Sequence, residues 1–100
     1  MTYNFSQIHA IKVLTIVVAR LNDLRNATNE IIDGVNHGKL QHCKARRQFR
    51  EIAEETDKYF TLACNVTAKY FDGKEEYYKD VINFGDWWKY FDAVNTYFRN

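Results

Sequence analysis

The chain contains no proline, and its four glycines stand at positions 34, 38, 73 and 85. Proline and glycine are the residues that interrupt a helix most strongly, so a helix can end easily only near these four points. The glycines therefore divide the 100 residues into two long segments and two short ones. Long helices joined by turns are the structure that this pattern favours.

The first long segment has the apolar periodicity of an amphipathic helix, from a cap at Asn4 or Ser6 to about Gly34. Its apolar residues fall in three adjacent heptad rows: Ile11, Val18 and Ile32; Leu14, Leu21 and Val35; and Ala10, Val17, Leu24 and Ile31. A polar row lies opposite, formed by Thr15, Asn22, Asn29 and Asn36. Val13 and Ile16 fall outside the stripe, so this half of the helix is expected to touch a second neighbour, either a later helix or a second subunit.

The second long segment, from about Lys39 to Asp72, repeats this pattern. Its heptad rows are Ala45, Ile52, Tyr59 and Val66 beside Phe49, Ala63 and Tyr70. The two segments have similar lengths, and the Gly34–Gly38 connection supplies residues that adopt positive φ readily. The sequence therefore predicts an antiparallel helical hairpin.

Two shorter helices are expected after a cap at Gly73. The first covers Lys74–Phe84 and buries Tyr77 or Tyr78 with Val81 and Ile82, and the second is capped by Asp86. The stripe of the last helix is Trp87, Phe91, Val94 and Phe98. No repeat or linker divides the chain. The prediction is an all-α fold, a long antiparallel helical hairpin packed with two shorter C-terminal helices, in a single domain over residues 1–100.

Composition and charge exclude several classes of protein. With 46% apolar and 27% charged residues, the chain is typical of a globular domain. A net charge of +1 gives no overall attraction to nucleic acid or to an anionic membrane. The apolar run Ile8–Leu21 is interrupted by charged residues and is too short to span a bilayer, so no membrane association is expected. Cys43 and Cys64 fall about 30 Å apart along one predicted helix, which disfavours a disulfide and indicates a reducing, cytoplasmic compartment.

No catalytic constellation stands out. The sequence shows no nucleophile beside a base, no paired carboxylates on an apolar face and no phosphate-binding glycine loop. His9, His37, His42 and Cys43 lack the spacing of metal ligands, and no second ligand pair accompanies them. We therefore expect no enzymatic activity, no cofactor and no metal.

A basic patch is the first candidate site. Five basic residues without an acid among them stand within twelve positions: Lys39, Lys44, Arg46, Arg47 and Arg50. One interpretation is structural, in which Asp23 pairs with Arg50 and Glu30 with Lys44 across the hairpin, helped by acids along the same helix. The other is functional, in which the residues of the patch bind phosphates or acidic groups.

The second candidate site is aromatic. Of the 16 aromatic residues, 11 lie between Tyr70 and Phe98, and short helices cannot bury both of their sides. Large rings with polar tips are typical anchors of protein interfaces, although the same rings can instead fill the core. The acidic residues between positions 72 and 80 disfavour stacking of these rings with nucleic-acid bases, because a surface that does this also carries basic residues. The residues predicted to bind a partner protein are Tyr77, Tyr78, Trp87, Trp88, Tyr90 and Tyr97.

These features favour a non-enzymatic protein-binding module. In size and helical class, the chain is similar to small phage or plasmid inhibitors and to bacteriocin immunity proteins, which implies a role in occluding a partner protein. The alternative is a nucleic-acid-binding protein that uses the basic face of the second helix. A homodimer in which Val13 and Ile16 pack against their symmetry mates is compatible with both hypotheses.

Overall fold

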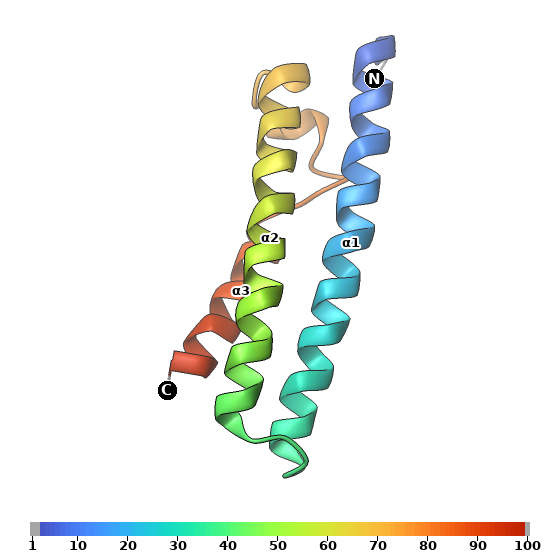
Figure 1. The fold of residues 1–100 in the computed structure, drawn as a ribbon. Coiled ribbons are helices and arrows are strands. Elements are labelled where there is room, and N and C mark those ends of the chain that lie inside the picture. Colours follow the sequence, from blue (N-terminus) through green and yellow to red (C-terminus); the bar gives the residue numbers. More distant parts are fainter. Residues whose placement is uncertain (1–2, 100) are drawn as a thin grey trace.

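The protein is an elongated all-helical domain built on a two-helix hairpin (Figure 1). The computed structural model describes residues 3–99, and this part measures 51 × 19 × 19 Å. Helix α1 (Phe5–Asn36) and helix α2 (His42–Phe71) run antiparallel side by side, and α3 (Phe84–Arg99) packs against the half of the hairpin that contains the α1–α2 turn. The all-α fold and the long antiparallel hairpin are thus confirmed.

Both ends of α1 are set by local chemistry. The Asn4 side chain accepts a hydrogen bond from the Gln7 backbone N–H (2.8 Å), and the Gln7 side chain accepts one from the Asn4 N–H (3.1 Å). This capping box starts the helix at Phe5. Gly38 adopts φ +71° in the turn, whereas Gly34 lies inside the helix. A Cβ on Gly34 would lie 3.2 Å from Leu40 Cβ, so this glycine is needed for close packing.

Helix α2 ends in a left-handed turn. Asp72 adopts φ 52° and Gly73 adopts φ 69°, and the Gly73 N–H donates to the Thr67 carbonyl oxygen (3.1 Å). The helix end predicted at Gly73 is therefore close to the observed one, but Asp72 is the first residue to leave the helical conformation. An L-residue with a side chain pays a steric penalty in this conformation that glycine does not.

The segment after α2 differs from its prediction. Only Glu75–Tyr77 forms a helix, a single 3-10 turn named η1, instead of a helix over Lys74–Phe84. Asn83 sets the later boundary of this segment, because its side chain accepts a hydrogen bond from the Asp86 N–H (3.3 Å) and so caps α3 in place of Asp86. Because a capping residue leaves the helical conformation, the preceding helix cannot continue to Phe84. The expected burial of Tyr78 and Ile82 is nevertheless present.

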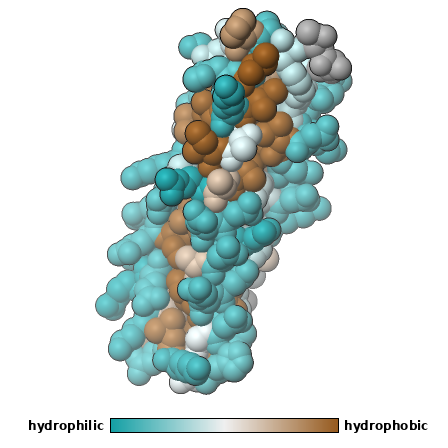
Figure 2. Space-filling view, turned by 90° about the vertical axis from the view of Figure 1, so that its right-hand side faces the viewer, coloured by the Kyte–Doolittle hydropathy of each residue, from teal (hydrophilic) through white to brown (hydrophobic). Residues whose placement is uncertain are grey.

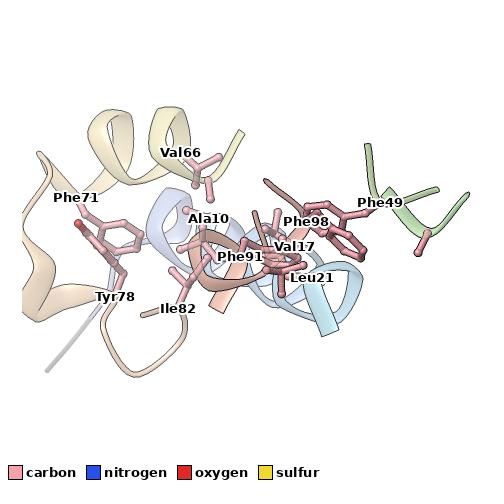
Figure 3. Close-up of a cluster of buried hydrophobic side chains, with 14 residues drawn as sticks. Ala10, Val17, Leu21, Phe49, Val66, Phe71, Tyr78, Ile82, Phe91 and Phe98 are labelled. Carbon is pink, nitrogen blue, oxygen red and sulfur yellow. The ribbon is translucent and has the colours of Figure 1, made fainter. Parts of the chain in front are cut away.

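A single core runs along the inner side of the hairpin and under α3 (Figure 3). Leu14, Leu21 and Val17 of α1 are at most 1% exposed, as the heptad rows predict. At one end of the core Phe71 contacts Tyr78, and at the other Phe49 stacks on Phe98 with ring centroids 5.2 Å apart. Phe60 meets the edge of Phe91 between these ends (6.2 Å). The aromatic rings of the C-terminal segment therefore complete the core of the hairpin.

Polar contacts fix α3 against α1 as well. The Tyr90 hydroxyl donates to the Asn29 side-chain oxygen (2.5 Å) and also lies 3.2 Å from the Arg25 carbonyl oxygen. The Tyr97 hydroxyl lies 3.5 Å from the Asn36 side-chain oxygen. Two members of the polar row opposite the apolar rows, Asn29 and Asn36, thus serve as acceptors for α3.

Candidate functional site

The six aromatic residues predicted to bind a partner are in different environments. Tyr78 is buried in the core, and Tyr77, Trp87, Tyr90 and Tyr97 are half-buried. Trp87 lies beneath the Arg25 guanidinium, 5.1 Å from the ring centroid, and Tyr90 and Tyr97 contact α1 as described above. Trp88 is 65% exposed and is, of these six rings, the one most available to a partner.

Trp88 stands on the edge of a groove between α2 and α3. Two hollows make up this groove, and they share Phe49, Ala53 and Asn95 in their walls. The α2 wall is formed by Arg46, Arg50, Ala53 and Asp57, and the α3 wall by Trp88, Asp92, Asn95 and Arg99. Each set follows the spacing i, i+4, i+7 and i+11, which is one stripe of a helix. Core rings form the floor: Phe49, Phe60, Phe91 and Phe98.

Opposite charges occupy the two ends of the α2/α3 groove. Arg46 and Arg50 of α2 lie with Arg99 of α3 at one end, because α3 runs antiparallel to α2. Asp57 of α2 and Asp92 of α3 lie at the other end. An apolar floor separates the two groups. The groove can therefore accommodate an apolar side chain and interact with an anionic and a cationic group on either side of it.

The basic patch is exposed over its whole length. Lys39, Lys44, Arg46, Arg47 and Arg50 are all exposed. Within residues 3–99, one ion pair has its nitrogen and oxygen atoms within 4.0 Å of each other. It joins the Lys79 ammonium to the Glu75 carboxylate. The structural interpretation, with pairs from Asp23 to Arg50 and from Glu30 to Lys44, is therefore wrong. Packing of the apolar stripes turns these charged side chains toward solvent, where holding a long side chain in an ion pair gains little.

Four groove residues were not recognised from the sequence as a site: Asp57, Asp92, Asn95 and Arg99. A signal was present, because Trp88, Asp92, Asn95 and Arg99 form the stripe next to the buried Trp87 stripe. That stripe could not be assigned a neighbour without knowing that α3 packs against α2. The contribution of Arg99 to the basic cluster follows only from this packing.

The histidines considered as metal ligands have other contacts. The His42 ring packs against Tyr97 and Phe98, with centroid distances of 5.8 and 5.6 Å, and His37 Nδ1 lies 2.7 Å from the Asp33 carbonyl oxygen. No group of three or more His, Cys, Asp or Glu side chains within the described residues is arranged to hold a metal ion. Cys43 and Cys64 are exposed and free.

Tyr90 has the one resolved pKa shift in the described part of the chain. Partial burial against α1 raises the pKa of its hydroxyl, and the nearby Arg25 guanidinium opposes this increase. Desolvation dominates because the ionised phenolate would lose hydration beside the Asn29 and Arg25 oxygens. The shift marks a structural contact of α3.

None of the helices in the described residues has the length and apolar composition needed to cross a bilayer. The α2/α3 groove, with Trp88 on its edge and charged groups at its ends, is the candidate functional site in the described residues. Compared with known protein families, with curated proteins and with solved structures, the chain shows no significant match.

Proposed function

We propose that this protein is a non-enzymatic binding module that holds a segment of a partner protein in the α2/α3 groove. The observation that supports this proposal is the order of side chains along the groove: a basic end at Arg46, Arg50 and Arg99, an apolar floor, and an acidic end at Asp57 and Asp92. Protein interfaces combine a desolvated apolar centre with complementary charges around it.

The chemistry of the groove defines the segment that fits it. A helix or an extended segment with one or two large apolar side chains, a carboxylate toward Arg50 and an ammonium or guanidinium toward Asp92 would satisfy all three regions. Trp88 supplies a large exposed ring at the edge, and tryptophan is enriched among residues that dominate binding energies. We assign it the role of the principal anchor.

The biological role proposed with this site is occlusion of the partner. In this proposal the protein covers a surface of its partner, as small phage or plasmid inhibitors and immunity proteins do. The proposal includes a cytoplasmic location, which free and exposed thiols at Cys43 and Cys64 support because such thiols persist in reducing compartments.

A pull-down from nuclease-treated host lysate tests the proposal. Wild type is compared with Trp88→Ala, with Arg50→Glu and with Arg47→Glu, which changes another exposed arginine that lies outside the groove walls. We expect a protein that is retained by wild type and Arg47→Glu and is lost from the two groove variants. Equal retention by all four folded proteins would contradict the groove as the binding site.

A second candidate function is binding to nucleic acid. It is favoured by the exposure of Lys44, Arg46, Arg47 and Arg50 and by the absence of ion pairs to them within residues 3–99. Phosphate binding by this face would weaken steeply with salt, because each neutralised phosphate releases counterions. Arg47→Glu and Arg50→Glu would then weaken binding to nucleic acid equally. The groove proposal instead predicts that only Arg50→Glu weakens binding to the partner protein. A lack of binding to DNA and RNA at low salt would exclude this candidate.

A further inference from the structure

The outer side of α1 carries an apolar surface that the rest of the fold leaves uncovered. Phe5 is 93% exposed, Ile16 61% and Ile8 44%. Figure 2, which faces the α1 side, shows hydrophobic atoms gathered over the part of the molecule where α1 begins, whereas the other end is mostly polar. Monomeric soluble proteins rarely leave several large apolar side chains together in water, so this surface indicates an interaction.

The exposed residues form one stripe. Together with Lys12, Ala19 and Asp23, which are also exposed, Phe5, Ile8 and Ile16 repeat at intervals of three or four residues. We name this set the α1 outer stripe. It points away from α2, which packs on the side of α1 that contains Leu14 and Leu21. Val13 is half-buried and packs against the core, so Ile16 is the central apolar residue available to a partner.

Charge is segregated along this stripe. No Asp or Glu precedes Asp23 in the sequence, and Lys12 is the charged stripe residue in that region. Beyond it, Asp23 and Glu30 continue the stripe with acidic residues. Neither Lys12 nor Asp23 forms an ion pair within the part of the chain that the structure describes. Within the stripe itself, the basic residue Lys12 thus lies toward the start of α1 and the acidic residue Asp23 lies farther along the helix.

We propose that the α1 outer stripe binds the same stripe of a second copy, antiparallel, in a two-fold symmetric dimer. With the axis between Val17 and Val18, Lys12 of each copy faces Asp23 of the other, and Ile16 faces Ala19 of the other. Ile8 then meets Ala27, a small residue that allows close approach of the helices. A parallel arrangement would place Lys12 against Lys12 and is disfavoured by like-charge repulsion.

The area of the α1 outer stripe limits the affinity of this dimer. From Phe5 to Glu30 it is about 38 Å long, and a helix is about 10 Å wide, so each copy buries about 400 Å². The total of about 800 Å² is below the roughly 1,200–2,000 Å² of stable interfaces, so a weak dimer is expected. The α2/α3 groove stays accessible in both copies. The dimer therefore does not depend on the proposed function, and would present two grooves to a partner.

Sedimentation equilibrium with charge exchange tests this arrangement. Lys12→Asp places carboxylates opposite each other at two symmetric positions, and Asp23→Lys does the same with ammonium groups. Each single variant is expected to raise the dimer dissociation constant by about tenfold or more, because two attractions become two repulsions. The double variant Lys12→Asp/Asp23→Lys restores opposite charges and should return the constant to within about threefold of wild type.

Lys58→Asp, on the exposed side of α2, is the matched control and should leave the constant unchanged. The proposal is overturned if wild type remains monomeric at about 1 mM, a concentration at which even a weak dimer is populated. The proposal is also overturned if the double variant fails to restore association. Equal weakening of association by Arg50→Glu would overturn it as well, because the α1 outer stripe of one copy would then bind the α2/α3 groove of the other. Monomeric wild type that binds anionic vesicles through Ile16 would assign the stripe to a membrane surface instead.

Discussion

Replacing Phe98 by alanine should strongly destabilise the fold, whereas replacing Trp88 by alanine should not. Phe98 is 3% exposed and stacks on Phe49 at 5.2 Å, so its removal leaves a cavity between α2 and α3. Truncations of this kind cost about 3–5 kcal/mol in the free energy of unfolding. Because about a third of Trp88 is in contact, its truncation is expected to cost about 0.5–1 kcal/mol.

Thermal and urea unfolding followed by circular dichroism measure both effects. For a domain of this size, 1 kcal/mol corresponds to a shift of about 4–8 °C in Tm, so Phe98→Ala should lower Tm by about 12 °C or more. Trp88→Ala should lower it by less than about 8 °C. A loss of stability in Trp88→Ala as large as that in Phe98→Ala would refute the division into core and surface rings. It would mean that Trp88 belongs to the core and cannot anchor a partner.

Three further variants test local parts of the fold. Asp72→Gly should raise the free energy of unfolding by about 0.5–1 kcal/mol, because glycine relieves the left-handed conformation at φ 52°; urea unfolding at neutral pH checks this. Asn4→Ala removes the capping box of α1 and should cost about 1 kcal/mol in the same assay, while Ser6→Ala, outside the cap, should change little. For Tyr90, the raised pKa stabilises the fold while the hydroxyl is protonated, so this contribution is full below the ordinary pKa of 10.0 and is lost as pH rises through the higher folded value. Tyr90→Phe should therefore show a smaller decline in stability above pH 10 than wild type, and parallel declines would contradict the assignment.

The sequence was sufficient to predict the long elements of the fold. The heptad rows that contain Leu14, Leu21 and Phe49 identify buried faces correctly because helix periodicity and burial are the same physical constraint in an amphipathic helix. The connection before α3 was harder to predict from the sequence. Asn83 and Asp86 both have suitable capping side chains, and in the structure Asn83, next to the buried Ile82, caps α3.

The candidate site was predictable only in part. The exposed arginines were recognised, but their expected pairing with Asp23 and Glu30 was not realised, since helix length and periodicity do not determine where flexible charged side chains point. The acidic end of the groove was missed because Asp57 and Asp92 lie 35 positions apart and meet only through the packing of α3 on α2. Juxtapositions of this kind come from tertiary structure and have no local sequence signal.

An NMR titration of the isotopically labelled protein with its captured partner tests the central claim most directly. If the partner segment binds in the α2/α3 groove, backbone amide shifts should concentrate at Ala53, Thr56, Asp92 and Asn95, which line it from both helices. The Trp88 indole N–H should shift as well, and Lys44 and Arg47 should change little. Shifts concentrated at Lys44 and Arg47, or along the outer side of α1, with the groove residues unaffected, would contradict the claim that this groove is the binding site.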